Sequence, residues 1–150
     1  MGYRNYELGD LFNRLMAQGK ERPTDRVARG VEYLNKYNPD WYKQVHIESL
    51  EIQDCLGCVL GQLHGSYMIG LSTYSTPELP TDGKYYAGDW DADWPIVFGF
   101  DGRPMGKNDI FQVYLDDCVA LTDAWKTAIT RLRQDAYNRT HGLTTPDPFF

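Results

Sequence analysis

The sequence predicts a mainly α-helical fold, with about five helices in one compact domain. Apolar residues recur at three- and four-residue spacing in several segments, and 14% of the 150 residues are aromatic, which supplies volume for a buried core. Glycine and proline are concentrated in residues 71–107, which we expect to form a long irregular loop with a short strand near 96–100. The expected layout is a single helical domain, residues 1–150, with a core at about 24–70 and 98–134, a loop insertion at about 71–97 and a C-terminal tail at 141–150.

Two helices are predicted before Pro39. The first covers residues 6–17, where four apolar side chains share one helical face. The second begins with Thr24 as its N-cap and ends before Pro39. A short helix with this proline in its first turn is then expected to carry Trp41 and Val45 into the core.

Three glycines at four-residue spacing, Gly57, Gly61 and Gly65, lie within an apolar segment that also contains Gln62 and that Asp54 can cap. In a helix interior each glycine costs about 0.8–1 kcal/mol relative to alanine. Close approach of another backbone or a ligand would offset this cost, because glycine has no Cβ. We therefore expect one glycine-striped helix packed against its neighbours at the centre of the molecule.

The clearest predicted helix follows Asn108 or Asp109, either of which can cap it. Its apolar stripe alternates three- and four-residue steps. The stripe consists of Phe111, Tyr114, Cys118, Leu121, Trp125, Ala128 and Leu132. Such a stripe either fills the core of its own chain or forms a partner surface, and the former is the commoner outcome in a single globular domain.

Composition disfavours several classes of partner. The net charge of −6 repels phosphate backbones, so we expect no nucleic-acid partner. There is no run of about 18 or more apolar residues, and the N-terminus lacks the basic-then-apolar layout of a secretory signal. We therefore expect no membrane partner and a cytoplasmic location. Three cysteines are an odd number, which favours reduced thiols over a disulfide framework.

The pair Cys55-x-x-Cys58 is half of a zinc site, because structural zinc needs two further nitrogen or sulfur ligands. His64 is a candidate third ligand, although its helical offset from Cys58 suits shared ligation poorly. The remaining candidates are His46, Cys118 and His141. The alternatives are a redox pair or two small buried packing residues, and the last is the expected role, so we predict no cofactor, with zinc as the alternative.

A run of alternating aspartates, Asp89, Asp91 and Asp93, matches the start of a calcium-binding loop. The match then fails, because Trp94 stands where the loop needs glycine and Phe100 stands where it needs a bidentate glutamate. We therefore expect a solvated acidic loop.

Four large aromatic residues, Tyr85, Tyr86, Trp90 and Trp94, lie among these aspartates. Exposed together they would resemble a protein-binding hot spot, and folded back they would cover the core. No Gly-x-Ser-x-Gly, His-Glu-x-x-His or phosphate-binding glycine loop is present, so no catalytic residue is predicted.

Six short motifs carry a family resemblance: Arg29-Gly-Val-x-x-Leu34, Pro39-x-Trp41, Ile47-x-x-Leu50, Cys58-Val-Leu-Gly-Gln-Leu-x-Gly-x-Tyr67, Gly99-Phe100 and Leu121-Thr-x-Ala-Trp125, the last followed by Ile129. With these motifs the chain resembles a family of small proteins of actinobacterial phages and their hosts. The resemblance implies no activity and no catalytic residue. It implies that the N-terminal helix and the loop from Leu71 to Trp94 are additions to a shared core.

These observations support three hypotheses of function. The first is a non-enzymatic phage or prophage accessory protein that binds a bacterial or phage protein in the cytoplasm through its aromatic loop. The second is a virion or assembly component that self-associates through the last helix. The third is a small metal-binding protein or enzyme that uses Cys55 and Cys58. The sequence leaves open whether the protein is a monomer or a homo-oligomer.

Overall fold

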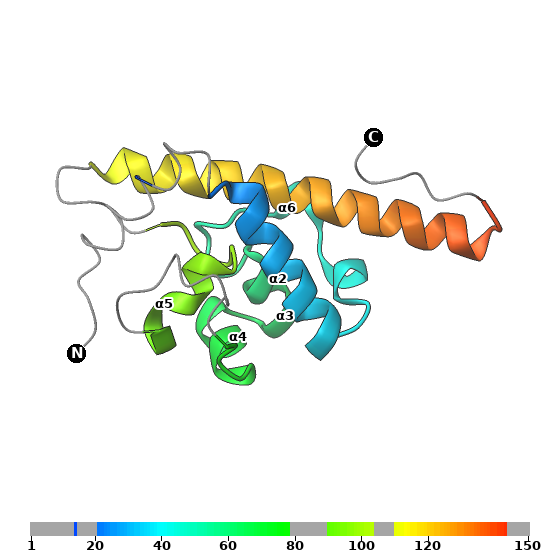
Figure 1. Ribbon diagram of the computed structural model, residues 1–150, viewed down its shortest axis with the longest axis horizontal. Helices are drawn as coiled ribbons and strands as arrows, with labels where there is room; N and C mark the ends of the chain where they lie inside the picture. Colours follow the sequence, from blue (N-terminus) through cyan, green and yellow to red (C-terminus); the bar gives the residue numbers. More distant parts are fainter. Residues whose placement is uncertain (1–13, 15–20, 79–89, 104–109, 144–150) are drawn as a thin grey trace.

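The computed structural model describes residues 14, 21–78, 90–103 and 110–143 (Figure 1). In these ranges the chain forms five α-helices and two short 3-10 helices, without a strand. The α-helices are α2 (Pro23–Tyr37), α3 (Val59–His64), α4 (Tyr67–Thr73), α5 (Trp90–Val97) and α6 (Phe111–Thr140), and the 3-10 helices are η1 (Trp41–Gln44) and η2 (Ile47–Ser49). The predicted mainly helical fold class is confirmed. Apart from Arg14, the helix predicted at 6–17 lies outside the described residues.

Helix α6 is the longest element, with 30 residues and a length of about 45 Å. It runs along one side of the molecule, and its C-terminal third extends beyond the other elements (Figure 1). The centre of the predicted stripe is confirmed, because Cys118, Leu121 and Trp125 are fully buried. The prediction is wrong at the start of the stripe, because Phe111 is 60% exposed. The residue at the N-cap position is Ile110, with no side-chain cap, and the predicted caps lie outside the described residues.

Aromatic rings and a backbone carbonyl surround Trp125 of α6. Its indole stacks on Phe100, with ring centroids 5.5 Å apart, and meets the edge of Trp41 at 5.7 Å. Its Nε1 donates a hydrogen bond of 2.6 Å to the carbonyl of Gly99. The predicted burial of Trp41 and Val45 is confirmed, and η1 therefore joins the core next to α6.

Helix α2 begins two residues earlier than predicted, with Arg22 rather than Thr24 at the N-cap position. Pro23 occupies the first helical position, where its missing N–H costs nothing. The carboxylate of Asp25 accepts the backbone N–H of Arg22, at 2.9 Å, so the predicted Thr24 cap is wrong. Further along, a Cβ at Gly30 would overlap the carbonyl of Phe98 and the ring of Trp125, which shows how closely α2 packs on the core.

A buried ion pair joins α2 to α6. The guanidinium of Arg26, which is fully buried, donates through Nη1 to both carboxylate oxygens of Asp117 at 2.9 Å. It also donates to the carbonyls of Ile96 and Asp101, each at about 2.8–2.9 Å. Asp117 in turn accepts the backbone N–H of Arg103 at 2.6 Å. The pair therefore fixes the chain from α5 to residue 103 between the two helices.

The three glycines expected to stripe one helix perform three different tasks. Gly57 lies in the turn before α3, close to Asp54, and Gly61 lies inside α3, where a Cβ would overlap the carbonyl of Cys55. Gly65 ends α3 in the left-handed conformation, with φ of 100°, and no neighbour lies within 4 Å of its Cβ position. The expected long helix is therefore wrong, because the chain breaks at Gly65 and restarts as α4. The close backbone approach is present at Gly57 and Gly61.

The region expected to be an irregular loop contains helix. Helix α4 continues to Thr73, and α5 occupies Trp90–Val97, so the short strand predicted at 96–100 is wrong. Burial of Trp94 and Val97 offsets the backbone hydrogen bond that Pro95 cannot donate inside α5. The chain then turns at Gly99, whose φ is 76°.

Replacing Asp117 with alanine is expected to lower the free energy of unfolding by about 3–5 kcal/mol, because it leaves the buried Arg26 guanidinium without its carboxylate. Urea denaturation followed by circular dichroism measures the change. Asp116→Ala is the matched control, since this neighbour is exposed and bonds only Gln112 among the described residues. The control should change stability by no more than about 0.5 kcal/mol. Equal effects of the two substitutions would contradict the role given to the buried pair.

Candidate functional site

Two of the candidate zinc ligands, Cys58 and His64, make other contacts in the structure. Cys58 is the N-cap of α3, and its Sγ accepts the backbone N–H of Gly61 at 3.2 Å, while Cys55 is exposed. Burial raises the pKa of the Cys58 thiol, which disfavours the thiolate that binds metal. His64 bonds the hydroxyl of Tyr74 at 2.7 Å instead. Within the described ranges, no three His, Cys, Asp or Glu side chains are placed to hold a metal ion together.

The acidic and aromatic loop also differs from expectation. Asp93 is buried, with 6% exposure, so a solvated acidic loop is wrong at this residue. Trp94 is 3% exposed and packs against Phe98 and Phe100, which removes it from any partner-binding surface. Trp90 is half-buried, and its Nε1 donates to the carbonyl of Pro77 at 2.7 Å. These two rings therefore cover the core.

The other residues singled out in this loop lie beyond what the structure describes. Tyr85, Tyr86 and Asp89 are outside the described residues, as is the side chain of Asp91. The described part of the loop thus offers no aromatic surface of the expected kind. A binding site has to be sought elsewhere among the described elements.

A carboxylate that the sequence analysis did not identify, Asp101, lies next to the core. Its Oδ1 accepts the hydroxyl of Tyr114 at 3.0 Å and the N–H of Gly102 at 2.8 Å, and its Oδ2 accepts the hydroxyl of Tyr67 at 3.2 Å. Burial raises the pKa of this carboxyl, and these hydrogen bonds partly oppose the rise. Both oxygens are already bonded to protein donors, so the cluster ties α4 and α6 together rather than presenting a free acid or base.

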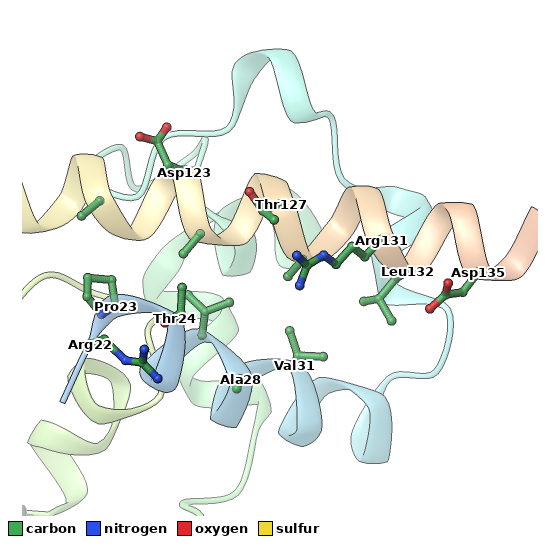
Figure 2. Close-up of a pocket in the computed structure, with 14 residues that line it drawn as sticks. Arg22, Pro23, Thr24, Ala28, Val31, Asp123, Thr127, Arg131, Leu132 and Asp135 are labelled. Carbon is green, nitrogen blue, oxygen red and sulfur yellow. The ribbon is translucent and has the colours of Figure 1, made fainter. Parts of the chain in front are cut away.

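An open groove lies between α2 and α6, with a volume of about 890 Å³ (Figure 2). It exists because the two helices touch around Gly30 and Trp125, whereas alanines occupy much of the adjoining surface and leave space. Its lining from α2 and the residue before it is Arg22, Pro23, Thr24, Val27, Ala28 and Val31, and its lining from α6 is Ala120, Asp123, Ala124, Thr127, Ala128, Arg131, Leu132 and Asp135.

Charged side chains lie at both ends of this groove. Arg22 and Asp123 lie toward one end and Asp135 lies toward the other, while the side chain of Arg131 extends from the Asp135 half of α6 back toward Thr127 (Figure 2). Asp123 and Arg131 form no ion pair with another described residue, whereas Arg22 pairs with Asp25 at 3.2 Å. An apolar floor with charged margins is the usual composition of a protein-binding surface.

One sequence pattern indicates this groove, and it is not part of the predicted apolar stripe. Ala120, Ala124 and Ala128 recur at four-residue spacing and place small side chains along one helical face. Of these three alanines, only Ala128 belongs to the predicted apolar stripe. That stripe followed the core-facing side of the helix, and the alanine face lies beside that side.

Comparison with protein-family models, with curated proteins and with solved structures finds no match. No described helix combines the length and apolar character that crossing a bilayer requires.

Asp101→Asn tests the electrostatics of the buried cluster. The pKa of Asp101 in the folded chain lies above the ordinary value of about 3.9, which holds in the unfolded chain. In the pH window between these two pKa values, the folded chain therefore binds more protons than the unfolded chain. The charge on Asp101 therefore costs stability as pH rises through the window. The unfolding free energy of the variant, relative to the unmodified chain, should rise with pH above about 4 and then level off. Urea titrations at several pH values measure this difference, and a constant or falling difference would contradict the assignment.

Proposed function

We propose that this chain is a non-enzymatic accessory protein of a phage or prophage that acts by binding a protein in the bacterial cytoplasm. The α2–α6 groove is the binding surface, and it receives a helical segment. The observation that carries the proposal is the groove itself, an apolar trough between two helices with charges at its ends.

The dimensions of the groove support a helical occupant. Its α6 side runs from Ala120 to Asp135, which is about 22 Å or four helical turns. The partly buried side chains of Val31 and Leu132 offer apolar surface along the trough. A helix with one apolar face buries that face in such a groove and leaves its polar face in water.

The biological setting rests on two further observations. The motif from Cys58 to Tyr67 carries the resemblance to small proteins of actinobacterial phages. The three cysteines are free thiols, including the exposed Cys55, and this chemistry fits a reducing cytoplasm.

A photo-crosslinking amino acid in place of Thr127, inside the groove, is expected to form protein adducts in actinobacterial cells. The same amino acid in place of Lys126, an adjacent position outside the groove lining, is the matched control. Adducts of defined mass should form from position 127, should be much weaker from position 126, and should disappear when Ala124→Glu places a charge in the trough. Absence of adducts at position 127, or equal adducts at both positions, would contradict the proposed function.

A further inference from the structure

We infer that the occupant of the groove is a second copy of this chain, with the α6 helix of each copy lying antiparallel in the α2–α6 groove of the other. This inference rests on the proposed function and names the partner for the same site. It is argued from the order of charges along the groove and from the symmetry of their positions.

The order of charges selects the orientation of the occupant. One end of the groove carries a cation and an anion, Arg22 and Asp123, and the opposite half of the α6 lining also carries a cation and an anion, Arg131 and Asp135 (Figure 2). A parallel second copy would place Asp123 against its own equivalent and Arg131 against its own equivalent. A copy turned end for end places Asp123 against the Arg131 of the second copy, and opposite charges then meet.

Symmetry makes this pairing occur twice. Asp123 and Arg131 each lie four residues from Thr127, so a two-fold axis at Thr127 exchanges their positions. Within one chain they are eight residues apart, about 12 Å along the helix, which is too far for an ion pair. Both side chains are exposed and lack an ion-pair partner among the described residues. The second copy supplies one for each.

The same axis brings a second pair of charges together. Arg22 lies at the Asp123 end of the groove, so the two-fold rotation places the Asp135 of the second copy opposite it (Figure 2). The Arg22 side chain is 67% exposed, and its hydrogen bonds to Asp25 use only Nε and one N–H of Nη2, which leaves further guanidinium donors for a second carboxylate. Four interchain ion pairs would therefore lie at the margins of an apolar centre.

Small side chains allow the two α6 helices to approach. Ala124, Thr127 and Ala128 lie around the middle of the α6 lining, with Ala120 at one end of it, and a helix separation of about 8–10 Å needs small or interlocking side chains there. Each α6 then contacts both α2 and the other α6. The result is a four-helix bundle made of two helices from each copy.

Charge reversal tests the orientation. The unmodified chain should show dimers in sedimentation velocity, with a monomer fraction that grows on dilution. Asp123→Arg and Arg131→Asp should each weaken dimerisation by about tenfold or more, because each creates two like-charge contacts. The double variant Asp123→Arg/Arg131→Asp should restore it. Glu48→Arg, an exposed position outside the groove lining, is the control for the change in net charge and should dimerise normally.

Cysteine crosslinking tests the register. In a Cys55→Ser background, which removes the exposed native thiol, Thr127→Cys should form a disulfide-linked dimer under mild oxidation because the axis brings position 127 next to its equivalent. Lys126→Cys should remain mostly monomeric under the same conditions. Circular dichroism confirms that each variant is folded.

Three results would overturn the inference. They are a monomeric unmodified chain at all concentrations, failure of the double charge reversal to restore dimers, and equal crosslinking from positions 126 and 127. If a monomeric chain still gives groove-dependent adducts with another protein in cells, the second-copy assignment fails and the proposed function stands. If position 127 gives no adduct of any kind, the proposed function fails as well.

Discussion

The ion pair between Arg26 and Asp117 determines how the main elements meet. It is buried, it joins residues 91 positions apart, and the same guanidinium donates to the carbonyls of Ile96 in α5 and of Asp101 after it. Taking two charges out of water is costly, and such pairs contribute more reliably to a defined arrangement than to net stability. Here the hydrogen bonds of the pair join α2 to α6 and both of these helices to the 96–103 segment, so the three have one mutual position.

That position creates the groove. Arg26 and Gly30 pack one side of α2 against the core. The adjoining side of α2, which carries Thr24, Ala28 and Val31, lines the groove. A larger side chain than alanine at position 28 or on the facing side of α6 would fill the space between the helices. The surface that we propose for binding is therefore a consequence of how the buried pair orients α2, and the small residues keep it open.

Local sequence patterns predicted the elements whose burial follows a regular period. Helix α2 and the centre of α6 were found because their apolar residues repeat at helical spacing. Helix α5 was missed, because Pro95 and nearby glycines are turn signals and only tertiary burial of Trp94 makes a helix favourable there. The glycine segment was misjudged for a related reason, since spacing does not distinguish close packing at Gly61 from a left-handed stop at Gly65. The contact of Asp101 with two tyrosines depends on a pairing between distant segments that no local period encodes. For the groove, the four-residue repeat of alanines in α6 marks one wall, whereas the position of α2 opposite that wall depends on tertiary packing.

Native-state hydrogen exchange tests most directly whether the buried pair unites α2 and α6. If it does, slowly exchanging amides in the buried half of α2, near Gly30 and Leu34, should open with the same free energy as those near Leu121 and Trp125 of α6. Both sets should then respond equally to low concentrations of urea, as parts of one cooperative unit. Exchange of the α2 amides through a low-energy opening that leaves α6 protected would contradict the account.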